Sequence, residues 1–153
     1  MKAFRFAPVW LGALLAIGVL TACEPSDNYP GQPVTHRRQA FRDIMKSFEA
    51  MGVMLRQDGY KADRFIELAN QYNTTFDKPW QYFGGPDTRY PPSTARAEIW
   101  TQAAQFEERK QAFLDASRRL VDVAATRDER RIADAYEAAH AQCEQCHKSF
   151  KDK

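Results

Sequence analysis

Two cysteines and a histidine lie close together near the end of the chain, in the sequence CEQCH from Cys143 to His147. In a helix these three side chains project from one side, because residues three and four positions apart are neighbours on the helix surface. Two thiols and an imidazole at this spacing can attach a porphyrin and ligate its iron, bind zinc, or act as a redox dithiol. The rest of the chain decides which of these chemistries is favoured.

The sequence C-x-x-C-H is the attachment signature of c-type haem, in which Cys143 and Cys146 add to the two vinyl groups and His147 ligates the iron. A redox dithiol expects a low-pKa thiol at a helix N-terminus, whereas this motif lies near the predicted C-terminal end of a helix, where the dipole disfavours a thiolate. A zinc site would need His36 or His140 as a fourth ligand. Two buried cysteines or a local disulfide are the structural alternative. We favour covalent haem c.

Residues 1–22 have the pattern of a secretory signal, with Lys2 and Arg5, an almost uncharged apolar run over residues 6–20, and then small residues. The apolar run is shorter than the about 20 residues that a membrane-spanning helix needs. The LTAC sequence at its end resembles the bacterial lipobox, in which the cysteine becomes the first mature residue and carries lipid. We therefore expect an exported lipoprotein anchored at Cys23, with an ordinary cleaved signal and an unmodified Cys23 as the alternative.

The next segment, residues 23–34, is polar and rich in proline and glycine, so we expect it to form a flexible tether. Residues 35–153 are enough for one domain and too few for two of ordinary size. Without residues 1–22, which hold two cations and no acid, the formal net charge of +2 falls to 0. A neutral mature chain lacks the electrostatic support that nucleic-acid binding requires.

The domain has the apolar spacing of amphipathic helices, with seam residues three or four positions apart. This spacing predicts helices over residues 36–58, 62–76, 98–125 and 128–151. Residues 77–97 hold four prolines and a glycine pair, so they are predicted to form a long connection, packed on the domain by its aromatic residues. The alternating pattern of strands is absent from the sequence. We therefore predict an all-α fold, an antiparallel four-helix bundle.

Four stretches of the sequence resemble cytochrome c′, a family of four-helix haem proteins of the bacterial periplasm. They are CEQCHKSFK at residues 143–151, PWQYFG at 79–84, AEIW at 97–100 and RRQAF at 37–41. The C-terminal position of the motif argues against class I cytochromes c, which place it near the N-terminus and use a later methionine ligand. The resemblance covers about residues 35–153 and implies a bundle with one covalently bound haem c.

The resemblance also implies roles for residues around the haem. His147 would be the proximal iron ligand, and the residue four positions after an arginine of the first helix would face the other side of the haem. Counted from Arg37 this distal residue is Phe41, and counted from Arg38 it is Arg42. Phe41 lies on the apolar seam and Arg42 does not, so the cost of burying a charge favours Phe41.

A phenylalanine cannot bind iron, so the predicted iron is five-coordinate and high-spin beneath an apolar distal lid. Met45, one turn after Phe41, is the alternative sixth ligand, although methionines at helical spacing more often pack than ligate. By resemblance, Arg37 or Arg38 is expected to pair with a haem propionate, and the alternative is that both cations face solvent. Lys151 stands where the family commonly has an arginine, which keeps the positive charge but loses the planar fork of donors.

An open iron site without a hydrogen-bond donor favours neutral diatomic gases, and the resemblance implies binding of NO or CO and scavenging of NO. Periplasmic electron transfer by a low-spin, methionine-ligated haem is the alternative function. The sequence shows no general base, nucleophile or metal-bound water site, so we do not expect an enzyme. The expected partners are the gases and redox proteins of the periplasm or membrane. The resemblance also implies a homodimer through the first two helices, to which Met51, Met54 and Tyr60 would contribute.

Overall fold

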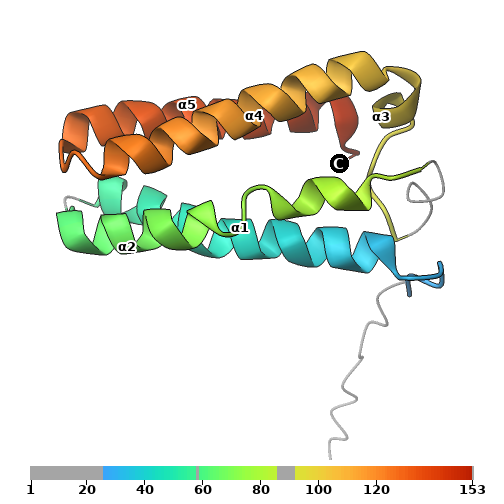
Figure 1. Ribbon diagram of the computed structural model, residues 1–153, viewed down its shortest axis with the longest axis horizontal. Coiled ribbons are helices and arrows are strands. Elements are labelled where there is room, and N and C mark those ends of the chain that lie inside the picture. Colours follow the sequence, from blue (N-terminus) through green and yellow to red (C-terminus); the bar gives the residue numbers. More distant parts are fainter. Residues whose placement is uncertain (1–25, 58, 86–91, 153) are drawn as a thin grey trace, which may run out of the picture.

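The protein folds as a bundle of antiparallel helices, and the computed structural model describes residues 26–57, 59–85 and 92–152. The helices are α1 Pro33–Arg56, α2 Ala62–Asn73, the 3₁₀ helix η1 Lys78–Tyr82, α3 Glu98–Thr101, α4 Ala103–Ala124 and α5 Glu129–Phe150. Figure 1 shows two layers, one of α1, α2 and η1 and one of α4 and α5. Within the described ranges the only extended pairing is an isolated bridge between Ala95 and Lys151. The predicted all-α four-helix bundle is confirmed.

The predicted third helix, residues 98–125, is divided in two. Gln102 has φ −123° and ψ 46°, outside the helical region. Its N–H closes α3 on the Glu98 carbonyl, and its own carbonyl accepts the Phe106 N–H at the start of α4. No proline or glycine interrupts this stretch, which is why the apolar spacing alone predicted one continuous helix. The long connection before it also contains a helical element, η1.

α1 begins at Pro33, and the segment before it is fixed to the helix by Asp27. Proline suits the first helical position because its φ is helical and it has no N–H to leave unpaired. The Asp27 side chain is buried, and its Oδ2 accepts the Thr35 N–H at 2.9 Å. A carboxylate there satisfies an unpaired donor and complements the helix dipole. The ordered domain therefore begins before residue 35, unlike the flexible tether predicted for residues 23–34.

The predicted signal over residues 1–22 and the predicted lipid site at Cys23 lie outside the described residues. In the part of the chain that the structure describes, no helix combines the length and the apolar character needed to cross a bilayer. The expectation of a lipid anchor at Cys23 stays a prediction.

The core lies between the two layers and is rich in aromatic side chains. Phe48 on α1 stacks on Tyr136 of α5, with ring centroids 4.5 Å apart. Gly52, one turn later on α1, allows this close approach, because a Cβ there would collide with the Tyr136 hydroxyl. Tyr72 on α2 and Ser117 on α4 are fully buried and share a hydrogen bond of 2.7 Å between their hydroxyls. The Phe48–Tyr136 stack thus positions α5 against α1, and the Tyr72–Ser117 bond joins α2 to α4.

We expect the Ser117→Ala variant to lose about 1–3 kcal/mol of unfolding free energy, because the buried Tyr72 hydroxyl loses its partner. Equilibrium unfolding in urea measures the loss. The Ser149→Ala variant is the matched control, since Ser149 is exposed on α5, and it should change the free energy by less than about 0.5 kcal/mol. Equal effects of the two substitutions would contradict the assigned role of the buried pair.

Candidate functional site

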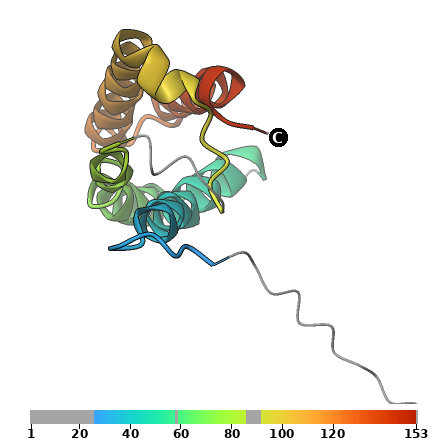
Figure 2. The ribbon, with the colours of Figure 1, turned by 90° about the vertical axis from the view of Figure 1, so that its right-hand side faces the viewer.

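α5 carries the CEQCH side chains at the end of the bundle where α1 begins (Figures 1 and 2). The helix starts at Asp128, whose side chain accepts the Arg131 N–H at 3.1 Å. Its buried seam consists of Ile132, Ala135, Tyr136, Ala139 and Phe150. Cys143 and Cys146 are half-buried beside this seam, and His147 is exposed. The structure therefore brings the two thiols and the imidazole together on the last turns of one helix, as their spacing predicts.

The two thiols are unpaired and protonated at neutral pH. Both cysteines are free in the structure. Burial, reinforced by Cys146, raises the pKa of Cys143 to about 11, and burial also raises the pKa of Cys146 against the opposing charge of Arg109. A dithiol oxidoreductase needs the reverse, a thiol whose pKa is lowered. The dithiol and disulfide alternatives therefore lose support, whereas two free thiols are what haem attachment requires.

The imidazole of His147 is kept neutral. Partial loss of solvent around the ring, together with the positive charge of Lys151, lowers the pKa of His147. A neutral imidazole retains a nitrogen lone pair for a metal ion. The Lys151 N–H donates to the His147 carbonyl at 3.1 Å and its side chain is exposed. The place of Lys151 beside the haem, which the resemblance implies, stays a prediction.

The side chains that a zinc site would need are not assembled here. His36 stacks on Tyr82 with ring centroids 5.6 Å apart, and His140 stacks on Phe48 at 6.3 Å. Among the described residues, no group of three or more histidine, cysteine, aspartate or glutamate side chains is arranged to hold a metal ion. Side-chain geometry in this part of the chain therefore gives the zinc alternative no support.

Residues 92–97, here called the strap, hold the chain that follows the site. The Arg96 N–H donates to the Phe150 carbonyl at 3.0 Å, and the Asp152 N–H donates to the Thr94 carbonyl at 2.9 Å. These two bonds lie on either side of the bridge between Ala95 and Lys151, the residue that caps the C-terminus of α5. The last turn of α5, which carries His147, is thereby fixed from its C-terminal side.

Arg37 connects the strap to α1 and η1. Its side chain is buried, and its guanidinium donates to the Ser93 hydroxyl at 2.7 Å and to the Tyr82 carbonyl at 3.1 Å. The guanidinium also lies 4.5 Å from the centroid of the Phe83 ring, within range of a cation–π interaction. Burial lowers the pKa of Arg37 to about 10, an effect that the charge of Asp27 partly opposes. The sequence did not reveal this connection, and the predicted contact of Arg37 with a haem propionate stays a prediction.

The Arg37→Gln variant should lose about 2–4 kcal/mol of unfolding free energy, because it removes a buried charged donor from two half-buried acceptors. Amide exchange within the strap should also become faster. Arg42→Gln is the matched control: Arg42 is exposed on the same helix, and its loss should cost less than about 0.5 kcal/mol. Unchanged strap exchange in Arg37→Gln would contradict the proposed connection.

Phe41 lies on the inner side of α1 and Arg42 on the outer side. The Phe41 ring makes edge-on contacts with Trp80 and Phe83, with centroids 5.8 and 6.5 Å apart. Phe41 also packs against the core, whereas Arg42 is exposed. This placement is the one that the apolar seam predicts for the register counted from Arg37. The distal role of Phe41 toward a haem stays a prediction.

The methionines of α1 differ in exposure. Met45, the alternative iron ligand, is 39% exposed and lies one turn after Phe41. Met51 is fully buried in the core, so it is not available to the dimer interface in which we expected it, and that expectation was wrong. Met54 and Tyr60 are half-buried against the core. The part assigned to these two in a dimer stays a prediction.

The end of the bundle has the chemical character that a porphyrin needs. Phe106 contacts Phe83 and Phe150, with ring centroids 5.1 and 5.3 Å apart, so an apolar wall extends from η1 to α5. The Nε1 of Trp100, in α3, is buried and has no hydrogen-bond partner among the described residues. A buried donor without a partner is costly unless a bound group satisfies it. Free thiols, a neutral imidazole, an aromatic wall and an unpaired donor together fit an apolar ring with polar edges.

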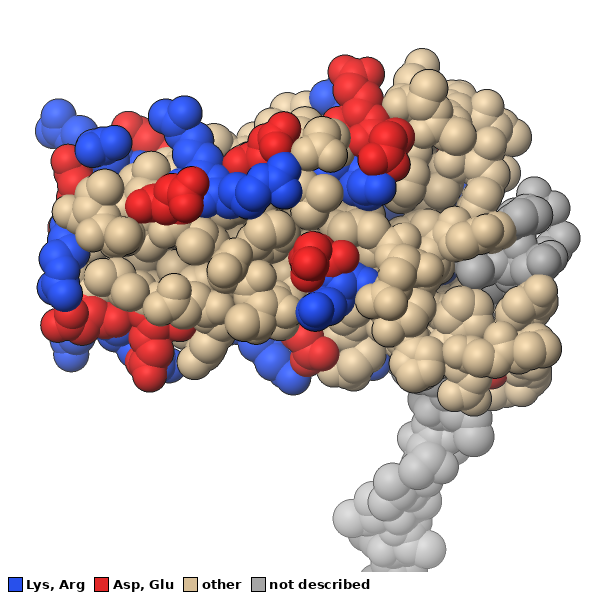
Figure 3. All heavy atoms as spheres, viewed as in Figure 1, with Lys and Arg blue, Asp and Glu red and all other residues tan. Residues whose placement is uncertain are grey.

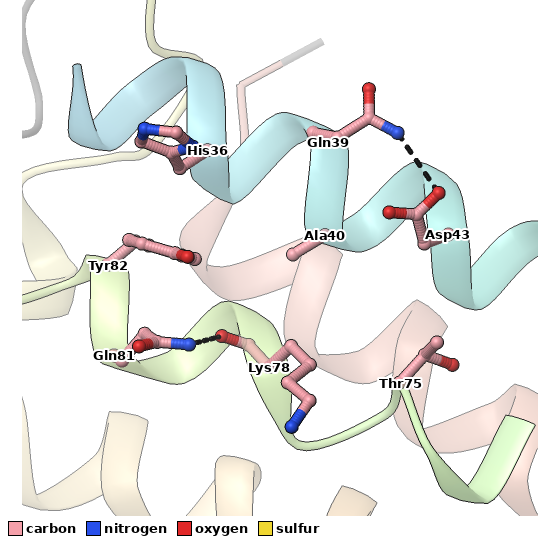
Figure 4. A pocket seen from close by; sticks show the side chains of 8 residues that line it. All are labelled: His36, Gln39, Ala40, Asp43, Thr75, Lys78, Gln81 and Tyr82. Carbon is pink, nitrogen blue, oxygen red and sulfur yellow. Dashed lines mark hydrogen bonds between the residues drawn. The ribbon is translucent and has the colours of Figure 1, made fainter.

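A separate cavity of about 220 Å³ opens between α1 and η1 (Figure 4). Its lining is mostly polar and includes His36, Asp43 and Lys78. Figure 4 shows the Gln39 amide bonded to Asp43 and the Gln81 amide bonded to the Lys78 carbonyl. None of the predicted haem-contacting residues lines this cavity, so it is not part of the CEQCH site.

A family profile and a similar protein of known identity both point to the same family. The sequence profile of the family described as Cytochrome C' matches residues 32–151. The chain is similar to cytochrome c' of Alcaligenes xylosoxydans xylosoxydans, with 30% identity over 125 residues, 81% of this chain and 96% of that protein.

Solved structures of cytochromes c′ are similar as well. Cytochrome c prime from Shewanella frigidimarina has a TM-score of 0.77 and 26% identity, covering 84% of this chain and all of the other. Cytochrome c' from Rubrivivax gelatinosus has a TM-score of 0.76 and 26% identity, covering 83% of this chain. The nitric oxide complex of a cytochrome c prime variant from Alcaligenes xylosoxidans has a TM-score of 0.75 and 28% identity, covering 84% of this chain. The Rubrivivax gelatinosus and Alcaligenes xylosoxidans chains are each covered over their full length.

The match spans both the start of α1 and the end of α5, so it includes the CEQCH sequence, the strap and Phe41. The free thiols and the aromatic wall at this end agree with it. The chain belongs to the cytochrome c′ family, which binds a single covalently attached haem c.

Proposed function

We propose that the iron of this cytochrome is five-coordinate and high-spin, with His147 as its protein ligand, and that it binds NO and CO on the opposite side. The observation that carries the proposal is the position of Phe41, which cannot ligate iron and lies on the inner side of α1 at the end of the bundle that holds His147. The neighbouring Trp80 indole donates to the Phe76 carbonyl at 3.1 Å, so its N–H is already used. The surroundings of Phe41 thus offer a ligand little polar stabilisation.

The haem iron supplies the coordination position at which a neutral diatomic gas binds. Cys143 and Cys146 would hold the porphyrin on α5, and His147 would ligate the iron. Phe41 excludes water and larger ligands from the other side. A distal surface without a donor favours NO and CO over O₂, whose bound form is polarised and needs hydrogen bonds.

Relatives support gas binding. Solved structures of cytochrome c prime from Alcaligenes xylosoxidans include nitric oxide complexes of several variants. Those complexes belong to that protein. They support the same chemistry here because the chain shares its family and its fold.

We extend the proposal to the place of action. The signal-like residues 1–22 and the LTAC sequence support export to the periplasm and a lipid anchor at Cys23. A tethered gas-binding cytochrome would scavenge NO beside the membrane and receive electrons from redox proteins there. The protein acts as a binder rather than an enzyme in this proposal, since no general base or nucleophile was recognised in the sequence.

Electron transfer is the second candidate function, and the observation that favours it is the exposure of Met45. This side chain is 39% exposed, one turn after Phe41, so its thioether is not committed to the core. If Met45 ligated the iron, the haem would be low-spin and the gas site would be closed. The two functions therefore differ in one iron ligand.

Carbon monoxide titration of the ferrous holoprotein separates the candidates, followed through the visible absorption of the haem. The Met45→Leu variant conserves volume and removes the thioether. We expect both proteins to bind CO with the same affinity. An affinity that rises clearly in Met45→Leu, or CO binding by this variant alone, would show that Met45 occupies the sixth position and would overturn the gas-binding proposal.

A further inference from the structure

Charged side chains are distributed unevenly along the bundle. Figure 3 shows Lys, Arg, Asp and Glu over the end with the α4–α5 turn and along the middle, while the described atoms at the end that holds α3 and the start of α1 are almost entirely tan on this face. Residues 99–106, IWTQAAQF, contain no charged residue, and residues 101–105 are exposed. We call residues 26–32, 97 and 99–105 the uncharged end.

Most charges described within or next to the uncharged end are buried or paired, whereas Lys148 and Lys151, near the end of α5 at the same end of the bundle, are exposed. Asp27 is buried against α1, where it caps the helix. Arg96 pairs with Glu98 at 2.5 Å and with Asp152 at 3.8 Å. Tyr29, at 44% exposure, adds an aromatic side chain with a polar tip to the same end. Little desolvation of charge would therefore accompany contact of the uncharged end itself with another surface that leaves Lys148 and Lys151 in water.

The position of the proposed lipid anchor indicates that the uncharged end is the end of the bundle that lies nearest the membrane. Cys23 precedes Asp27 by four residues, a segment that reaches at most about 14 Å when fully extended. α1 has 24 residues and so extends about 36 Å. Because Asp27 is fixed at the start of α1, the lipid must enter the membrane near the uncharged end, and the α4–α5 turn lies a bundle length away.

We infer that the uncharged end rests against the bilayer that holds the Cys23 lipid, so that the bundle stands on the membrane with the haem site at its membrane side. This inference rests on the lipid anchor in the proposed function. The mature chain has no net charge, so it gains no overall attraction to anionic lipid through its charged sides. Tyr29 suits the headgroup region, where aromatic residues with a polar tip are enriched.

This orientation places the proposed gas-binding site next to the bilayer, where NO and CO are concentrated. Small apolar molecules transfer favourably from water into an apolar phase, so NO and CO are enriched in the bilayer. The strap ties the end of α5 to the start of α1, so the CEQCH site lies at the same end as Asp27. In this orientation, a gas molecule that leaves the bilayer reaches the CEQCH site directly.

Hydrogen–deuterium exchange of the lipidated holoprotein on vesicles of phosphatidylethanolamine and phosphatidylglycerol tests the orientation. Amides of residues 97–105 should exchange several-fold more slowly on vesicles than in the Cys23→Ser protein, which carries no lipid. Amides of the α4–α5 turn, residues 125–128, should exchange at the same rate in both. Slower exchange at the α4–α5 turn, or no change at residues 97–105 in vesicle-bound protein, would overturn the orientation.

A matched pair of variants tests the role of the missing charge. Ala104→Glu places a carboxylate in the first turn of α4, where the helix dipole tolerates it, and it should abolish most of the protection. Ala125→Glu adds the same charge at the far turn and should leave the protection intact. Mass spectrometry of Cys23 distinguishes failure of the lipid anchor from failure of the orientation. If the chain carries no lipid and does not bind vesicles, both proposals are wrong. If the chain is lipidated but residues 97–105 are not protected, only the orientation is wrong.

Discussion

The double variant Cys143→Ser, Cys146→Ser should lose its covalent haem completely. Both cysteines are half-buried on the last turns of α5, and we predict that each forms one thioether bond to the porphyrin. These bonds survive denaturation, whereas the bond from His147 to the iron does not. A denaturing gel stained for haem and the mass of the intact chain measure the loss. The haem stain should vanish and the mass should fall by that of one haem, apart from the two sulfur-to-oxygen changes.

Two single variants complete this experiment. Cys143→Ser should keep its haem through one thioether bond, with an altered absorption spectrum. Cys23→Ser removes the remaining thiol of the chain without touching α5, so its haem content should be normal. Haem that stays attached in the double variant, or is lost in Cys23→Ser, would contradict the assignment of the two attachment sites.

The Phe41→Ala variant should bind CO at least about tenfold more tightly than the natural chain, which corresponds to about 1.4 kcal/mol. In the proposed function a ligand has to displace the Phe41 ring from its contacts with Trp80 and Phe83. Alanine removes that cost and opens the distal side. The association rate constant should rise with the affinity, and flash photolysis of the CO complex measures it.

Loss of a core aromatic side chain also destabilises the fold, so the effect on affinity needs a control. Phe65→Leu removes ring contacts from α2, where Phe65 is fully buried and contacts Tyr60. It should lower the unfolding free energy and leave CO affinity unchanged. The same CO affinity in Phe41→Ala and in the natural chain would mean that Phe41 does not cover the iron.

The sequence predicted most of the elements that position the site, since the apolar seams of α1, α4 and α5 have a strong helical period. It also predicted Cys143, Cys146 and His147 as the haem site, because the C-x-x-C-H spacing is dictated by the cofactor rather than by the fold, and that assignment stays a prediction. The helical break at Gln102 escaped prediction, since no glycine or proline marks it. Met51 was misassigned to a surface because periodicity identifies the face of a helix but not what covers it.

The other features that the sequence did not predict depend on contacts between residues that lie far apart in the sequence. Arg37 was predicted to lie near a haem propionate, which stays a prediction, whereas its bonds to Ser93 and to the Tyr82 carbonyl join segments that lie far apart in the sequence. Asp27 was placed in a flexible tether because its neighbours are proline, glycine and polar residues, and composition does not show that one carboxylate reaches the Thr35 N–H. Both residues needed the tertiary structure.

The spin state of the iron tests the central claim most directly. The measurement is the visible spectrum, ferric and ferrous, of the full chain exported in a host that attaches c-type haem, recorded before and after addition of CO. The account predicts a high-spin ferrous spectrum without a sharp α band that changes when CO binds. A low-spin ferrous spectrum with a sharp α band and no response to CO would contradict it, because a protein side chain such as that of Met45 would then occupy the position assigned to the gas.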